Sequence, residues 1–169
     1  MRKKIFLLIV FIAIIMTPIM ISYSDYQSTN VNNDYLEGFT NNLNTAINEK
    51  NHFAMTDITN FEWDRLYMFQ PYTSRDEMEK IVGTEWNTNH SYTGYLMHKS
   101  SLGDYPLSDD SLHKLVFVND DKVVLDITLD RYSVDFTASK GIIEPNESSY
   151  IVETTGDHSI IIRNLIAKN

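Results

Sequence analysis

The 169-residue chain contains no cysteine. Disulfides, thiolate metal sites, cysteine nucleophiles and a lipid-modified cysteine are therefore all excluded. If the chain is exported, its hydrophobic core must hold the fold without covalent cross-links. Hydrophobic residues make up 43% and charged residues 22%, a composition that allows such a core and argues against wholesale disorder.

Glycine is scarce, at six residues, and the chain has neither a Gly-rich phosphate loop nor a dinucleotide fingerprint. It also has no G-x-S-x-G nucleophile motif. The five histidines are scattered without the short spacing of metal ligands, and the acidic turns at 109–110 and 119–121 lack the pattern of a calcium loop. The sequence therefore predicts no catalytic, metal or cofactor site of a known pattern.

Basic residues are few and unevenly placed. Three of the 14, at positions 2–4, precede the first acidic residue, Asp25. The rest of the chain carries 11 basic and 23 acidic residues, a net charge of −12. Such a charge repels phosphate backbones and anionic lipid heads, so the sequence predicts no binding to nucleic acid.

The basic N-terminus leads into an apolar run over residues 5–21, interrupted only by a Thr-Pro pair. This order is typical of an export signal, and Ser22 and Ser24 have the spacing of a cleavage site after residue 24. A run of 17 residues also suffices to span a bilayer as a helix. Residues 1–24 are predicted as either a cleaved signal peptide or an uncleaved signal anchor, and both place the rest of the chain outside the cytoplasm.

Residues 25–33 (DYQSTNVNN) are polar and Asn-rich, which predicts a tether between membrane and domain. Residues 34–169 show no repeat and no second boundary, so they are predicted to form one extracytoplasmic domain. Its first element is a predicted helix over 34–50, where apolar residues recur at three- and four-residue spacing.

The strongest local signals lie in residues 61–86. Aromatic residues alternate with other types over 61–69, which predicts a strand with one aromatic face that ends before Pro71. The S-x-x-E sequence at Ser74 is a capping box for a helix over 75–82, and Gly83 is the expected stop.

Further strands are predicted downstream: a strand at 92–98, a hairpin of 114–118 with 122–129, and a hairpin of 150–153 with 159–165. Residues 131–147 are predicted to be irregular. Together these elements predict an α+β fold, an antiparallel sheet with two helices on one face, preceded by an N-terminal hydrophobic export helix.

The string Trp63-Asp64-x-x-Tyr67-x-Phe69-x-Pro71-Tyr72-Thr73 is followed by the predicted helix and by GTEW at 83–86. This string and the LVFVNDDKVV hairpin at 115–124 resemble an uncharacterised group of small exported or membrane-anchored proteins of Gram-positive bacteria. The resemblance covers about half of the chain and implies an exported protein. It carries over no catalytic or ligand-binding residues.

Aromatic and arginine side chains in this region form the candidate binding patch. Its members are Trp63, Arg65, Tyr67, Tyr72 and Trp86. These residue types are enriched at binding hot spots, and the Arg65 guanidinium has the spacing to lie against the rings of Trp63 and Tyr67. The alternative for the aromatic residues is a core that joins the strand to the helix.

The sequence therefore predicts an uncharacterised exported or membrane-anchored protein that acts as a non-enzymatic binding or interaction module at the cell envelope. Its expected partners are the membrane, through an uncleaved N-terminal helix, and an envelope protein or peptide. An alternative is a small extracytoplasmic hydrolase that uses carboxylates, for which Glu62 and Asp64 are the nearest pair. A third is an accessory of a membrane complex, contacted through the uncleaved helix.

Overall fold

A computed structural model describes residues 2–100, 107–139, 141–155 and 159–165. The chain divides into two compact units. The first unit consists of residues 1–30 and 87–103, and the second of residues 31–86 and 104–169. Helices and antiparallel sheets are both present, which confirms the predicted α+β class.

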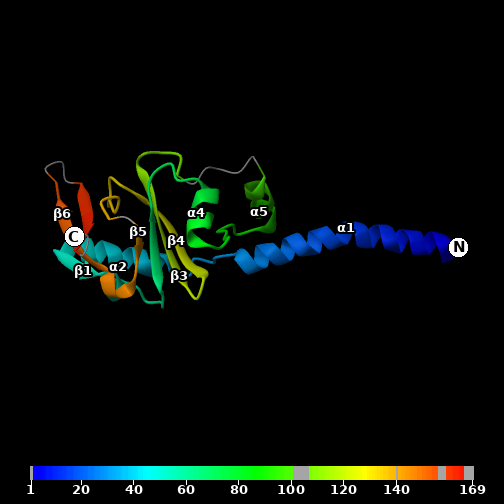
Figure 1. The fold of residues 1–169 in the computed structure, drawn as a ribbon, viewed down its shortest axis with the longest axis horizontal. Coiled ribbons are helices and arrows are strands. Elements are labelled where there is room, and N and C mark those ends of the chain that lie inside the picture. The colour runs from blue at the N-terminus through cyan, green and yellow to red at the C-terminus, as the bar shows by residue number, and fades with distance from the viewer. Residues whose placement is uncertain (1, 101–106, 140, 156–158, 166–169) are drawn as a thin grey trace. The chain divides into compact units, whose positions relative to one another are not determined.

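The first unit contains two helices, α1 (Arg2–Thr29) and α5 (Tyr92–Lys99) (Figure 1). Helix α1 is long and apolar enough to cross a membrane, and none of its apolar stretch is buried. It continues past the Ser22–Ser24 site, so residues 25–29 are helical and do not form the predicted tether. Extending a helix that already exists adds one hydrogen bond per residue without the cost of a new nucleus.

Helix α5 replaces the strand predicted at 92–98. Ser91 is its N-cap, and the Ser91 Oγ accepts a hydrogen bond from the Gly94 backbone N–H at 3.2 Å. Such a cap satisfies one of the free N–H groups at a helix start. The Tyr-rich composition suggested a strand, but Tyr92 and Tyr95 at three-residue spacing share one face of a helix.

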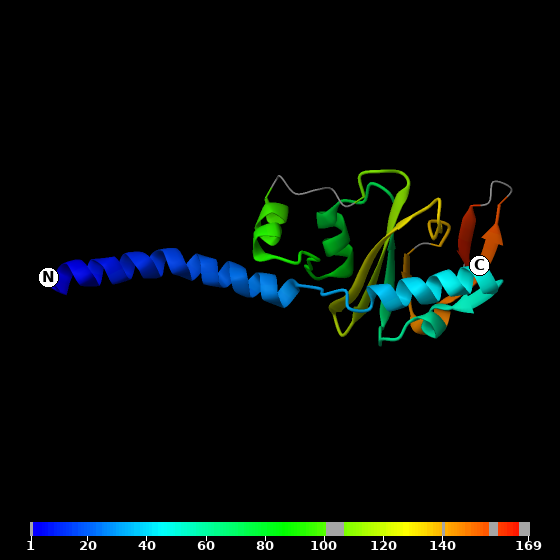
Figure 2. The same ribbon diagram turned by 180° about the vertical axis from the view of Figure 1, so that it is seen from behind.

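The second unit contains two antiparallel sheets instead of the single sheet predicted, as Figures 1 and 2 show. Four strands pair in the order β4-β3-β2-β5, and three pair in the order β1-β6-β7. The strands are β1 (His52–Ala54), β2 (Arg65–Phe69), β3 (Leu112–Asn119), β4 (Lys122–Asp130), β5 (Gly141–Ile143), β6 (Ser149–Thr154) and β7 (Ile160–Asn164). The helices are α2 (Leu36–Glu49), α3 (Met55–Ile58) and α4 (Arg75–Val82), with a 3-10 turn at Pro145–Glu147.

Both predicted hairpins are present. Strands β3 and β4 are joined through Asp120 and Asp121, whose φ angles of 49° and 60° give the left-handed backbone of a two-residue hairpin turn. Strands β6 and β7 pair from Tyr150 to Thr154, and the tip of their turn at 156–158 lies outside the described residues.

Strand β2 is shorter than the predicted 61–69 and lies between β3 and β5. Its inner position buries both faces. Leu66 and Met68 belong to one apolar cluster, whereas Tyr67 and Phe69 belong to another. The alternation in the sequence therefore separates two buried faces, not one buried and one exposed face.

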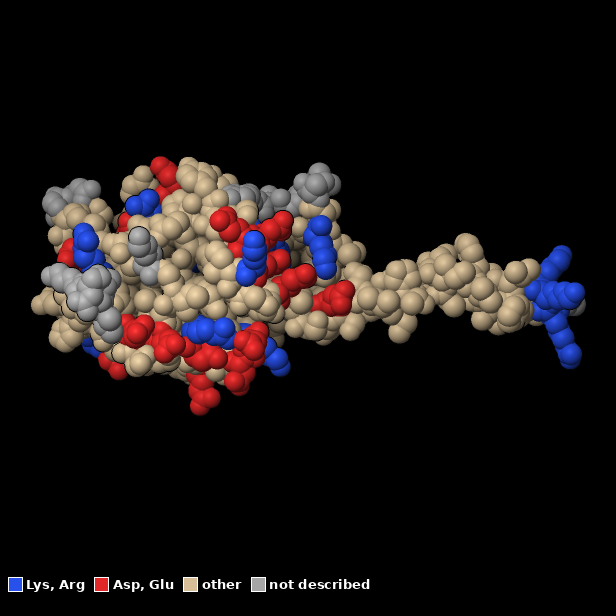
Figure 3. All heavy atoms as spheres, in the orientation of Figure 1, with Lys and Arg blue, Asp and Glu red and all other residues tan. Residues whose placement is uncertain are grey.

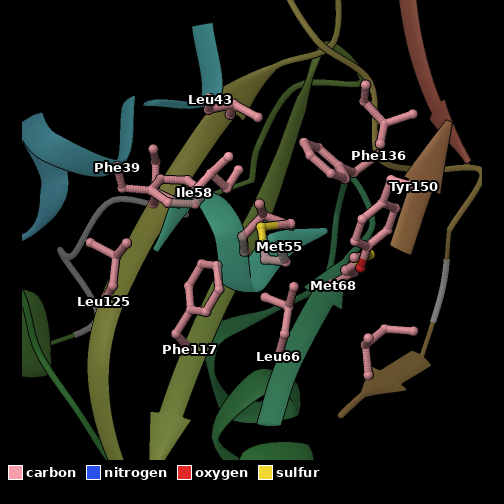
Figure 4. Packing of buried hydrophobic residues seen from close by; sticks show 14 of the residues in the cluster. Phe39, Leu43, Met55, Ile58, Leu66, Met68, Phe117, Leu125, Phe136 and Tyr150 are labelled. Carbon is pink, nitrogen blue, oxygen red and sulfur yellow. The ribbon is translucent and has the colours of Figure 1, made fainter. Parts of the chain in front are cut away.

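The larger core lies between the two sheets and helices α2 and α3 (Figure 4). Phe39 of α2 and Phe117 of β3 meet there edge to face at 5.2 Å. The smaller core lies on the opposite face of the four-stranded sheet, where α4 contributes Met78 and Val82. Helices α2 and α4 thus cover opposite faces of this sheet, which corrects the prediction of two helices on one face.

Candidate functional site

The five residues of the predicted binding patch do not form one exposed surface. Trp63, Tyr67 and Trp86 are each no more than 7% exposed, whereas Tyr72 is 59% exposed. Trp63 lies in the larger core, and Tyr67 and Trp86 lie in the smaller one. The side chain of Arg65 is 32% exposed. The structure therefore places most of the aromatic set in the core, the alternative considered from the sequence.

Arg65 is held by carboxylates. Its Nε donates to Asp64 Oδ1 at 3.2 Å, another guanidinium nitrogen pairs with Asp121, and a third donates to the Tyr67 hydroxyl at 3.3 Å. The hydrogen bonds that Arg65 donates to Asp121 and Asp64 raise the pKa of Arg65. The second oxygen of Asp64 accepts from the backbone N–H of Asp120 at 3.1 Å. One oxygen of Asp64 thus bonds Arg65, and the other bonds the β3–β4 turn.

A buried polar cluster that the sequence did not indicate surrounds Asp126. Its two carboxylate oxygens accept from Lys114 Nζ and from Trp86 Nε1, the latter at 2.6 Å. The side-chain amide of Asn33 bonds both the backbone N–H and the backbone carbonyl of Asp126 at 3.0 Å. Because these groups satisfy one another, the cluster is a structural element of the core and not an open reaction site. Asn33 and Asp126 are 93 residues apart, so no local sequence motif predicts their contact.

His113 is 1% exposed. Its Nε2 accepts from the backbone N–H of Phe136 at 3.3 Å, and burial lowers its pKa to about 4. The imidazole is therefore neutral at pH 7 and out of reach of a substrate in solvent.

A hollow of about 280 Å³ on the second unit is lined largely by polar residues. Burial acts to raise the pKa of Asp135 there, but hydrogen bonds from Thr137 and Arg131 outweigh it and hold that pKa below its usual value. Arg131 also donates to the carbonyl of Asp110 at 3.0 Å. Arg131 and Asp135 thus already form an ion pair with each other in this hollow. Within the described ranges, no group of three or more His, Asp or Glu is placed to hold a metal ion.

Four tyrosines of the first unit form a compact set, called here the tyrosine cluster. It consists of Tyr23 and Tyr26 of α1 with Tyr92 and Tyr95 of α5. Neighbouring ring centroids lie 5.3 to 6.2 Å apart, the range in which aromatic pairs attract. The last two turns of α1 therefore pack against a segment 66 to 69 residues further along the chain.

Asn87 fastens the end of α1 beside this cluster. It is 2% exposed, its backbone N–H donates to the carbonyl of Thr29 at 2.8 Å, and its side-chain amide donates to the Thr29 hydroxyl at 2.8 Å. Asn30 donates to the Asn87 side-chain oxygen and, at 2.7 Å, to the carbonyl of Asn89. The end of α1 is thus built into a folded unit by both ring contacts and hydrogen bonds.

The opposite end of α1 carries the three basic residues of positions 2–4 (Figure 3). Positions 5–24 of the helix contain no Lys, Arg, Asp or Glu. A cationic end, an apolar length and an aromatic end succeed one another along the helix. This order suits a membrane span or an export signal.

These features define a class, an α+β protein whose N-terminal apolar helix suits a membrane span or an export signal. Comparison of the chain with protein-family models, with curated proteins and with solved structures finds no match. The resemblance of the Trp63-led string to exported Gram-positive proteins therefore stays a prediction.

Proposed function

We propose that this protein is a single-span membrane protein, anchored by the uncleaved helix α1, that presents its second unit outside the cytoplasm as a non-enzymatic binding module. The observation that carries the anchor is the continuity of α1 through the Ser22–Ser24 site into the tyrosine cluster and the Asn87 contacts.

Cleavage after Ser24 would remove Tyr23 and leave only residues 25–29 of the helix. An isolated helix of that length is far below the roughly 12 residues at which helices become marginally stable in water. Tyr92 would also lose its ring contact with Tyr23 at 5.3 Å. A chain that keeps α1 preserves all of these contacts, which favours the anchor over the cleaved signal peptide.

The charge distribution favours the outward orientation. Positions 2–4 are basic, and basic residues beside a span stay on the cytoplasmic side. The second unit carries 10 basic and 22 acidic residues, a net charge of −12. A unit of this charge is best suited to a partner whose surface is positively charged.

The binding role is favoured over the hydrolase by the state of the titratable groups. The oxygens of Asp64 are bonded to Arg65 and to the Asp120 backbone, and His113 is buried and neutral. A carboxylate mechanism needs an acid and a base that face the same open space. Asp64 and His113 instead form hydrogen bonds within the fold.

The absence of cysteine allows topology to be tested with single-cysteine variants. Tyr132→Cys places a thiol at a side chain that is 79% exposed in the second unit, and Lys3→Cys places one at the basic end of α1. On intact cells, a membrane-impermeant maleimide is expected to label position 132 and to label position 3 only after permeabilisation. Labelling in the reverse order, or release of the chain from membranes by alkaline carbonate, would contradict the proposal.

The binding role is tested with the full detergent-solubilised chain as bait in envelope extracts. A basic partner is expected to be retained at low salt and released at high salt, because salt screens attraction between exposed charges. Retention that is indifferent to salt, or none at all, would count against an electrostatic binding module.

A further inference from the structure

Helix α5 lies across the direction of α1 rather than alongside it (Figures 1 and 2). The two helices belong to the same compact unit and meet through the tyrosine cluster. If α1 crosses the bilayer, a helix that runs across it lies roughly parallel to the membrane surface.

The height of α5 relative to the bilayer follows from its ring contacts. Tyr92 meets Tyr23 at 5.3 Å, and Tyr23 follows the apolar run of residues 5–21 by two positions. Two residues of helix correspond to about 3 Å along the axis. The start of α5 is therefore level with the outer edge of the hydrocarbon, the layer in which tyrosine side chains are enriched.

The side of α5 that faces the bilayer can be identified from the same contacts. Tyr92 touches both Tyr23 and Tyr26, whereas Tyr95 touches Tyr26, the more distant of the two from the apolar run. The Tyr92 side of α5 is thus the side nearer the hydrocarbon. Leu96 follows Tyr92 by four residues and shares that side.

Two apolar side chains on this part of α5 are exposed. Leu96 is 44% exposed and its neighbour Met97 is 65% exposed. The segment 87–100 around them contains no acidic residue, although the chain has 23. Unlike the second unit, this segment therefore carries no negative charge that lipid phosphates would repel.

We propose that α5 is an interfacial helix that inserts Leu96 at the boundary between head groups and acyl chains, with the exposed Met97 next to it in the chain, in the outer leaflet of the membrane that α1 spans. This inference rests on the proposed function, because α1 must be a membrane span for α5 to lie at that height. A lipid surface is the occupant that this height and charge favour. Amphipathic helices in this position bury their apolar face at the head-group boundary.

The test uses the full chain in vesicles of phosphatidylcholine and phosphatidylglycerol, with a bimane fluorophore on single cysteines. Leu96→Cys and Met97→Cys report on α5, Ile14→Cys reports on α1, and Ile81→Cys on the exposed face of α4 is the matched control in the second unit. Lipid-borne nitroxide and aqueous iodide serve as the two quenchers.

The fluorescence of labels at 96 and 97 is expected to fall about twofold or more when the lipids carry a nitroxide near the head groups. The same labels are expected to be protected from quenching by iodide. The label at 81 is expected to show the opposite behaviour. If position 14 is quenched by lipid while 96 and 97 respond like 81, the interfacial helix is overturned and the anchor stands. If position 14 is also quenched only by iodide, the anchor itself fails and the inference fails with it.

Discussion

At the residue scale, the least expected feature is the ion pair of Lys114 with Asp126, whose side chains are 9% and 6% exposed. Nothing in the sequence brings these two residues together except the register of β3 and β4, in which Val116 is opposite Asp126. Removal of one charge would leave the other buried with its main partner missing. Broken buried pairs cost far more than the pair gains in stability.

Lys114→Met is therefore expected to lower the free energy of unfolding by about 3–5 kcal/mol. Urea unfolding of the full chain in detergent, followed by tryptophan fluorescence, measures the change. Arg163→Met is the control, because the Arg163–Glu153 pair is roughly half exposed and is expected to contribute less than about 1 kcal/mol. Equal losses in the two variants would mean that Lys114 is not buried with Asp126.

His113 gives the fold a dependence on pH. Burial lowers its pKa in the folded chain from 6.5 to about 4, and the charges of Asp135, Arg131 and Asp130 modify this effect. Between these two pH values the unfolded chain binds the proton more readily. Stability is therefore expected to fall as the pH drops from 6.5 to 4, by up to roughly 3 kcal/mol.

Denaturation of the full chain at a series of pH values between 7 and 4 measures this loss. A His113→Gln variant is expected to lose stability less steeply over that range, whereas His52→Gln, at an exposed position of β1, is expected to retain the wild-type slope. An unchanged slope in His113→Gln would show that another group is responsible.

At the same scale, the aromatic residues show why the sequence could not tell a binding patch from a core. Large rings on a strand serve equally well in a core or on a binding surface, and the sequence cannot distinguish the two. Trp63 joins the larger core through an edge-to-face contact with Phe117 at 5.5 Å, while its ring N–H donates to Thr59. Thr59 is only four residues earlier in the chain, but Phe117 lies on β3, and its position depends on the folded sheet.

At the scale of elements, helix α4 and the β3–β4 hairpin were predictable because their signals are local. Ser74 caps α4 by accepting from Glu77, and Gly83 ends it with a φ of 86°. Helix α5 and the last turn of α1 depend on contacts between distant segments. The short strand β1 and helix α3 were missed because each has too few residues to show periodicity.

We expect the hydrogen bonds of Asn87 to hold the segment that leads into α5 against the end of α1. Asn87→Ala removes the hydrogen bond to the Thr29 hydroxyl and leaves the Asn30 amide with one partner fewer. The loss of a buried hydrogen bond of this kind is expected to destabilise the unit locally by about 1–3 kcal/mol. Amide hydrogen exchange should become faster in α5 and in residues 25–29 and stay unchanged in β3.

Asn48→Ala is the matched control, because Asn48 lies on the exposed side of α2 and donates to the Asn44 carbonyl one turn earlier. It is expected to leave exchange in α5 unaltered. Protection of α5 that persists in Asn87→Ala would show that the tyrosine cluster alone holds the unit.

At the scale of the whole molecule, the α+β class followed from composition and periodicity, whereas the number of sheets did not. The sequence predicted β2 as a strand with one aromatic face and gave no sign of a further strand beside it. In the structure β5 pairs with β2, and a second sheet covers the larger core. Residues 141–143 were predicted to be irregular. The tertiary fold determines which segment pairs with the edge of a sheet, and residue spacing in the sequence carries little information about that pairing.

The function proposed here depends above all on α1 remaining attached to the rest of the chain. Intact mass spectrometry of the protein from the membrane fraction measures this most directly. The account predicts a mass that includes the basic N-terminus and the whole of residues 5–21. A chain that begins at Asp25 would contradict it, because that chain would have lost both Tyr23 and the segment that spans the bilayer.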